Sequence, residues 1–128
     1  TVGDEEAPAD LTIDQIERFI GAKPERKQSS AEMLADAQRS YDVFHIIIEE
    51  GDYARSHKDR VIESWSKILG QHVIRLSDHK KLAETIVSTI EVVEGRDAAE
   101  VTKKFGTEVF TAVKHLPKSR TPRLALPA

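Results

Sequence analysis

The chain has 128 residues, 39% of them hydrophobic and 32% charged, which is typical of one soluble globular domain. It contains no cysteine, which excludes a disulfide framework, a thiolate metal site and a cysteine nucleophile. The net charge of −3 argues against general nucleic-acid binding, and no apolar run or signal pattern indicates a membrane span, so we predict a cytoplasmic protein without a membrane partner.

The first predicted elements are the end of a strand and a short helix. The opening residues TVGDEEAP indicate a strand that ends at Gly3, directly before three acids. Residues 11–21, LTIDQIERFIG, predict a helix in which Thr12 and Gln15 form a capping box and Gly21 follows the end. We expect this helix to place its isoleucines on the core.

A second helix and a buried strand come next. Residues 29–41 predict a helix with Ser29 and Glu32 as its capping box. Its inward-facing residues are expected to be Met33, Leu34, Ala37 and Tyr41. Residues 43–48, VFHIII, form a short run rich in β-branched residues without polar alternation, which predicts a strand buried on both faces. His45 is expected to be a buried, hydrogen-bonded core residue.

The middle of the chain predicts a loop, a helix, a strand and a longer helix. Residues 49–59 are expected to form a loop, residues 59–70 a helix with Trp65 on its apolar side, and residues 72–76 a strand. The longer helix spans 77–95, with Ser77 as its cap. Its apolar stripe, expected to face the core, consists of Leu82, Ala83, Ile86, Val87 and Ile90.

The C-terminal part predicts helix and tail. Residues 96–116 predict one helix, or two that are broken at Gly106, with Asp97 and Glu100 marking the start. Residues 117–128 contain three prolines and no hydrophobic period, which indicates a mobile, basic tail.

The alternation of strands and helices predicts an α/β fold. We expect a three-layer, Rossmann-like arrangement in which a mostly parallel sheet is flanked by helices, with an extra C-terminal helix. Three strands make a thin sheet for so much helix, so we also expect further strands upstream of Thr1 or on another chain.

Oxygen-bearing side chains follow each predicted strand, and ligands of open α/β sheets bind at this edge. These residues are Asp4, Glu5, Glu6, Glu49, Glu50, Asp52, Ser77 and Asp78. Carboxylates and hydroxyls suit a hard cation such as Mg²⁺ or Ca²⁺. The alternative is that these residues are solvated loop acids and helix caps.

Two other binding surfaces remain open. Arg55 and His57 lie in a long loop before a helix N-terminus, where they could hold an anionic ligand or form part of a small enzyme, although a polar surface loop would look the same. A basic C-terminal end could bind an acidic partner or a nucleic acid, or form a solvated surface. Its residues are Lys103, Lys104, Lys114, Lys118, Arg120 and Arg123.

The segments TVGDEEAP, IERFIG, YDVFHIIIEEG and SWSKILGQHVIRLSDHKKLAETIVSTI resemble the C-terminal half of a bacterial von Willebrand factor type A-like domain. The resemblance covers residues 1–95 and would leave 96–116 as an appended helical segment and 117–128 as a tail. It implies a partial parallel sheet in which Asp4 is the metal-associated acid. The family's Asp-x-Ser-x-Ser stretch and threonine loop have no counterpart here.

The resemblance implies a non-enzymatic protein-interaction module that binds Mg²⁺ or Ca²⁺ weakly, or not at all in this chain alone. In the complete domain the cation's open position would accept a carboxylate from a protein partner. Self-association, or completion by an upstream half-domain, is expected because the sheet would have open edges. An anion-binding domain or enzyme and a regulatory domain with a basic end are the second and third hypotheses.

Overall fold

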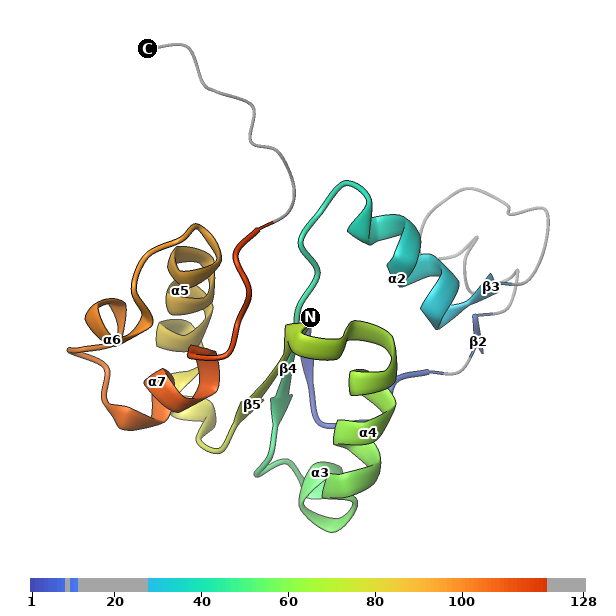
Figure 1. The fold of residues 1–128 in the computed structure, drawn as a ribbon. Coiled ribbons are helices and arrows are strands. Elements are labelled where there is room, and N and C mark those ends of the chain that lie inside the picture. Colours follow the sequence, from blue (N-terminus) through green and yellow to red (C-terminus); the bar gives the residue numbers. More distant parts are fainter. Residues whose placement is uncertain (9, 12–27, 120–128) are drawn as a thin grey trace.

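The centre of the molecule is a small parallel sheet. The computed structural model describes residues 1–8, 10–11 and 28–119. Strands β1 (Val2–Gly3), β4 (His45–Ile48) and β5 (Val73–Leu76) are parallel and lie in the order β1-β4-β5 (Figure 1). The run of β-branched residues in β4 therefore occupies the middle of the sheet, as its continuous apolar character predicted.

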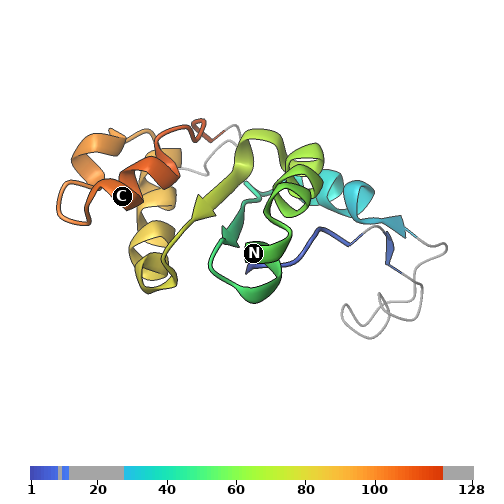
Figure 2. The ribbon, with the colours of Figure 1, turned by 90° about the horizontal axis from the view of Figure 1, so that it is seen from below.

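Helices lie on both faces of this sheet, as Figure 2 shows. One group is α2 (Ser30–Gln38), α3 (Asp52–Ser56) and α4 (Lys58–Leu69), and the other is α5 (Leu82–Val93), α6 (Ala98–Val101) and α7 (Thr107–Val113). Two short 3-10 helices, η1 (Gly70–His72) and η2 (His79–Lys81), flank β5. The predicted α/β fold with a parallel sheet and flanking helices is confirmed.

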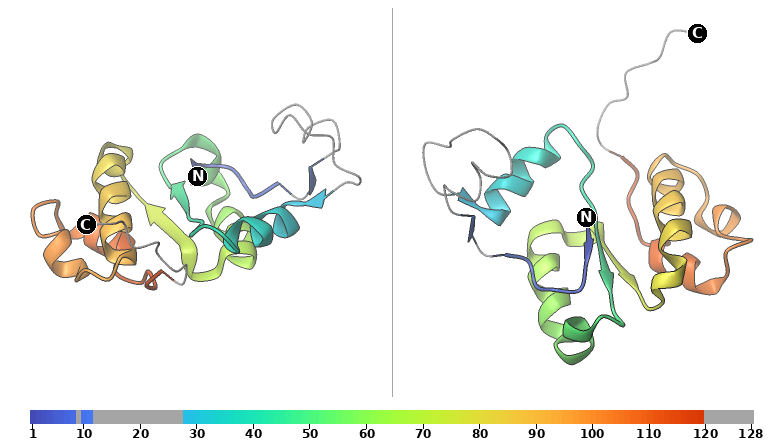
Figure 3. Two further views of the ribbon diagram at one scale, coloured as in Figure 1. Left: turned by 90° about the horizontal axis from the view of Figure 1, so that it is seen from above. Right: turned by 180° about the vertical axis from the view of Figure 1, so that it is seen from behind.

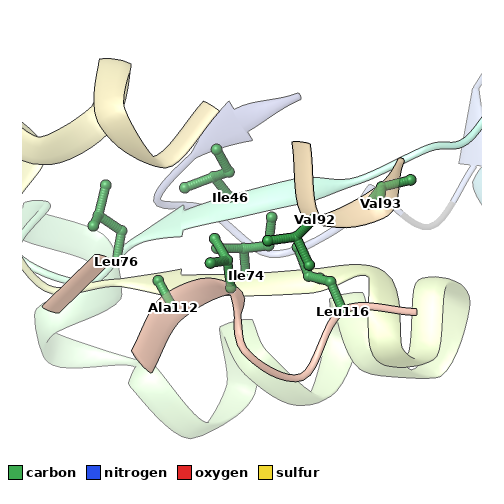
Figure 4. Packing of buried hydrophobic residues seen from close by; sticks show 8 residues of the cluster. Ile46, Ile74, Leu76, Val92, Val93, Ala112 and Leu116 are labelled. Atoms are coloured by element: carbon green, nitrogen blue, oxygen red, sulfur yellow. The ribbon is translucent and has the colours of Figure 1, made fainter. Parts of the chain in front are cut away.

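Alternate residues of the strands divide the core into two clusters. Ile47 and Val73 point to the face that α3 and α4 cover. Ile46, Ile74 and Leu76 point to the other face, where they pack with residues of α5 and α7 and with Leu116 (Figure 4). This alternation is what a strand covered on both sides requires, because successive side chains point to opposite faces.

The second face is covered unevenly. Val2, Ile46 and Ile74 occupy neighbouring positions across the three strands, because Val2 pairs with Ile46 and Ile46 pairs with Ile74. Ile74 is 0% exposed and Ile46 is 5% exposed, whereas Val2 is 46% exposed. Helix α5 therefore covers β5 and β4 but leaves β1 largely open.

A two-stranded ribbon lies away from α5, α6 and α7 (Figure 3). It pairs β2 (Asp10–Leu11) with β3 (Gln28–Ser29) in antiparallel register. The predicted helix at 11–21 falls outside the described residues apart from Leu11, which belongs to β2. Helix α2 begins as predicted, because the Ser29 hydroxyl accepts a hydrogen bond of 3.1 Å from the Glu32 amide.

Three local predictions are wrong. The loop predicted at 49–59 contains helix α3 and the start of α4. Ser77 does not cap α5, because the 3-10 helix η2 lies between them. The N-cap of η2 is Asp78, whose side chain accepts a hydrogen bond from the Lys80 amide at 2.9 Å. Tyr41 does not face inward, since it is 70% exposed.

Helix α5 is rotated relative to its predicted orientation. Its buried residues are Thr85, Ser88, Thr89, Val92 and Val93. Ile86, Val87 and Ile90, which belong to the predicted core stripe, are 41%, 49% and 55% exposed. The helix thus buries a largely hydroxyl-bearing face and turns an aliphatic face outward.

The C-terminal region joins the core. The predicted break occurs at Gly106, whose φ of 99° lies in the region that favours glycine. Asp97 caps α6 as expected, and Val113 on α7 is fully buried in the core cluster that contains Ile74 and Val92. Ser119 is held by its amide, which donates to the Val93 carbonyl at 2.8 Å.

No helix within the described ranges is both long and apolar enough to cross a bilayer.

Candidate functional site

The carboxyl ends of the three strands meet at one edge of the sheet, because all three are parallel. Residues that follow each strand therefore lie near one another, as the sequence predicted. The structure nevertheless pairs most of them with neighbouring groups of the chain, so their arrangement differs from one open cluster of carboxylates.

Asp4 lies against the start of α3. Its Oδ2 accepts a hydrogen bond from the Tyr53 amide at 3.2 Å. Gly51, the N-cap of α3, has no side chain for this purpose, and a Cβ placed there would lie 2.5 Å from the Asp4 Cβ. Asp4 therefore caps a helix that begins almost fifty residues later, and Gly51 permits this close approach.

The residues after Asp4 attach β1 to α3 and α4. The Tyr53 hydroxyl donates to Glu6, and this hydrogen bond raises the pKa of Tyr53. The Trp65 indole N–H donates to the Glu5 carbonyl at 2.9 Å, and the Ala7 amide donates to the Ser64 hydroxyl at 3.0 Å. The acidic segment thus has a structural role on this face of the sheet.

Glu49 is held by two cations. Arg75 on β5 donates a hydrogen bond from Nε to the Glu49 Oε2 at 2.9 Å, its Nη2 lies 2.9 Å from the same oxygen, and the Lys58 ammonium lies 3.3 Å away. The Glu49 side chain is only 12% exposed. Because two cations already share its Oε2, Glu49 is a poor candidate for a metal ligand.

Glu50, Asp78 and His79 form the metal-capable group found among the described residues. One ligand atom of each lies within 4.8 Å of the others. Glu50 accepts a hydrogen bond from the His79 amide and also contacts the His79 Nδ1. The hydrogen bond from the amide is the main cause that lowers the pKa of Glu50. Asp4, which the resemblance implies is the metal-associated acid, is not part of this group.

The predicted anion-binding residues are also paired. Arg55 donates to Asp52 at 2.7 Å, one turn earlier on α3, and both side chains are exposed. The His57 ring stacks on the Tyr53 ring, with 4.3 Å between centroids. At the basic end, Lys103, Lys104, Lys114 and Lys118 are exposed, while Arg120 and Arg123 lie outside the described residues.

An aromatic stack of the buried His45 on the partly exposed Trp65 joins β4 to α4. The His45 and Trp65 rings are 3.6 Å apart at their centroids and inclined by 10°. His45 is 3% exposed, and burial lowers its pKa to about 4. Its Nδ1 lies 2.7 Å from the Thr1 hydroxyl, whereas no described residue pairs with its Nε2. The predicted core position of His45 is confirmed.

The uneven cover of the sheet creates an apolar surface. We call the exposed residues Val2, Ile86, Val87 and Ile90 the α5–β1 surface. A cavity of about 280 Å³ opens between β1 and α5, and Phe44, Ile46 and Ile74 contribute to its lining. Sequence periodicity missed this surface, because it assigned the aliphatic stripe of α5 to the core.

A larger cavity of about 620 Å³ lies along the free edge of β5. Ser77 borders it and donates to Glu108 on α7, a residue that no motif singled out.

No family model, curated protein or solved structure matches this chain. The function must therefore be argued from these surfaces.

Proposed function

We propose that this chain is a non-enzymatic protein-interaction module that binds an amphipathic helix of a protein partner on the α5–β1 surface. The observation that carries the proposal is the exposure of Ile86, Val87 and Ile90 on α5, where Ile86 and Ile90 line one cavity with the half-exposed Val2. Contiguous exposed aliphatic groups are uncommon on a monomer and mark interaction sites.

The expected occupant follows from the architecture. Parallel sheets occur almost entirely with both faces covered by helices. On this face α5 covers Ile74 and Ile46, while the next position, over Val2, holds no helix among the described residues. A helix lying beside α5 would fill that position and would contact the α5–β1 surface with one apolar stripe.

The test starts by locating the contact in cells. A photo-crosslinking amino acid is placed at Ile90, and the matched control places it at Ala99, which is exposed on α6. We expect a defined protein adduct from position 90 and none from position 99. The captured protein is then purified and titrated against wild type, Ile90→Glu and Ala99→Glu.

A helix-binding surface predicts that Ile90→Glu weakens binding at least about tenfold, since it places a charge in an apolar contact, while Ala99→Glu leaves it unchanged. Equal affinity of both variants would refute the proposal. An adduct between two copies of this chain would show that a second copy, rather than a foreign helix, occupies the surface.

A second candidate is a divalent-cation site at the carboxyl edge that helps to bind an acidic partner. It is favoured by the convergence of Glu50, Asp78 and His79. Two carboxylates and an imidazole suit Mn²⁺ or Zn²⁺ better than Mg²⁺ or Ca²⁺, which prefer oxygen alone. All three ligands are at the surface or partly exposed, so we expect weak binding.

Manganese titration followed by amide NMR distinguishes two positions of such a site. Broadening at residues 78–80 that His79→Asn abolishes would support the geometric group. Broadening at residues 3–6 that Asp4→Asn abolishes would instead support the position implied by the resemblance to von Willebrand factor type A-like domains, which stays a prediction. A uniform response would remove both.

A further inference from the structure

The free edge of β5 forms the floor of a groove, which we call the β5 groove. One wall is a face of α4 and includes Ile62 and Ser66, one turn apart. The other wall belongs to α7 and the residues after it. It is formed by Glu108, Thr111, Ala112 and His115, whose spacing places them on one side of a helix.

Helix α7 lies along β5 and is fixed at both ends of the strand. At the carboxyl end the Ser77 hydroxyl donates to Glu108. At the other end the His115 Nε2 lies 2.9 Å from the Val73 carbonyl. The groove is therefore a built feature of the fold, with a volume of about 620 Å³.

Backbone geometry shows which groups of β5 face the groove. The Glu49 amide donates to the Leu76 carbonyl at 2.9 Å, so the backbone groups of Leu76 point toward β4. Since backbone directions alternate along a strand, those of Val73 and Arg75 point away from β4. The contact of His115 with the Val73 carbonyl agrees with this assignment.

Arg75 is consequently the centre of the open edge. Among the residues that the structure describes, no hydrogen bond joins a partner to its backbone N–H or C=O. Its side chain, by contrast, is engaged with Glu49. An unpaired donor and acceptor on an edge strand are the features that an added strand recognises.

We propose that the β5 groove binds an extended peptide segment of another protein, which adds as a fourth strand beside β5. From residue 73 to residue 76 the strand rises about 10 Å, so it matches a segment of about four residues. The charged side chains in the groove already have partners within the chain, because Glu49 pairs with Arg75 and Lys58 and Glu108 accepts a hydrogen bond from Ser77. The ligand is therefore an uncharged segment that is recognised through its backbone.

This inference does not depend on the α5–β1 surface, which lies over the opposite edge of the sheet. The probe is a phage-displayed library of random eight-residue peptides selected on the intact chain. Enriched sequences are synthesised and titrated by fluorescence anisotropy. We expect uncharged peptides that perturb the Arg75 amide resonance when they bind.

Two variants of one residue separate the backbone from the side chain. Arg75→Ala and Arg75→Pro both remove the side chain and its contact with Glu49, so they form a matched pair. Arg75→Pro also removes the N–H, which an edge position tolerates because it does not pair with β4, and we expect it to bind at least about tenfold more weakly than Arg75→Ala. Equal binding by the two variants would overturn the proposal.

A second measurement uses the wild-type chain, in case Arg75→Pro does not fold. Single N-methyl groups are placed along the bound peptide. Strand addition predicts that affinity falls at least about tenfold at every second amide and changes little at those between. A loss without alternation, the failure to enrich any peptide, or a peptide whose binding Ile90→Glu abolishes would contradict the proposal.

Discussion

Helices α4 and α5 have the same length, twelve residues, and pack on opposite faces of the same sheet, but they use their apolar residues differently. Helix α4 buries Val61 and Leu69 against Ile47 and Val73. Helix α5 exposes Ile86 and Ile90. The apolar side of α4 lies on the core of its own chain, whereas most of the predicted apolar stripe of α5 is exposed.

The difference shows that an amphipathic pattern predicts a helix but does not say what covers its apolar side. Two of the three buried hydroxyl groups of helix α5, those of Thr85 and Thr89, bond within the helix. Thr85 donates to the Lys81 carbonyl at 2.8 Å, and Thr89 donates to the Thr85 carbonyl at 2.7 Å. Its aliphatic side then remains available for another surface.

The largest expected contrast between the two helices comes from truncating one aliphatic residue on each. Leu69→Ala should lower the free energy of unfolding by about 2–5 kcal/mol, because Leu69 is buried in the core cluster with Ile47 and Val73. Ile90→Ala should change it by no more than about 0.5 kcal/mol, because Ile90 is mostly exposed. Urea denaturation measures both values.

Both variants are measured as the isolated chain, without a binding partner. If Ile90→Ala destabilised it as much as Leu69→Ala, the aliphatic side of α5 would already be covered. The comparison between the two helices, and the proposed partner surface with it, would then be lost.

The sequence identified the elements better than their orientation. The apolar run at 43–48 predicted the central strand, and Ser29 and Asp97 predicted two helix starts, because these signals are local. Helix α3 was missed because Gly51 supplies no capping side chain. Its cap, Asp4, comes from a strand far away in the sequence.

The candidate site was also predicted only in part from the sequence. That acids would gather at the carboxyl edge followed from the parallel direction of the strands, which the alternation of elements predicted. That Glu49 would be neutralised by Arg75, and Ser77 held by Glu108, depends on side chains from other elements. Such pairings are tertiary and leave no mark in a single sequence.

The next largest expected effect is a loss of folding stability at low pH that comes from His45, on the face that α4 covers. His45 stacks on Trp65, and burial lowers its pKa to about 4, below the usual value of 6.5. The unfolded chain binds this proton more readily, so stability is complete above pH 6.5 and falls as the pH decreases to about 4. The slope should reach about 1.4 kcal/mol per pH unit.

Urea denaturation at pH 7.5, 6, 5 and 4.5, with Trp65 fluorescence as the signal, measures this slope. The control is His45→Asn, which removes the titrating ring and should flatten the profile in this range. An unchanged slope in the variant would show that carboxylates elsewhere, rather than His45, carry the dependence.

A smaller effect concerns the attachment of β1 to the α4 side. Gly51→Ala would place a Cβ 2.5 Å from the Asp4 Cβ and should cost about 1–3 kcal/mol through displacement of α3. Gly3→Ala is the control, since the nearest atom, His45 Cε1, is 3.8 Å away. Thermal unfolding compares them, and equal loss would show that the Asp4 contact with α3 has no special role.

The smallest effect makes the comparison of α4 with α5 most direct, because the same substitution is made on both. On α4, Ser64 accepts from the Ala7 amide and donates to the Val61 carbonyl, so Ser64→Ala should cost about 0.5–1.5 kcal/mol. On α5, Ser88 is fully buried and its hydroxyl has no partner among the described residues, so Ser88→Ala should be neutral or slightly stabilising. Urea denaturation of both variants gives the signs. A clear loss for Ser88→Ala would mean that its hydroxyl is satisfied, and that the buried face of α5 is as fully bonded as that of α4.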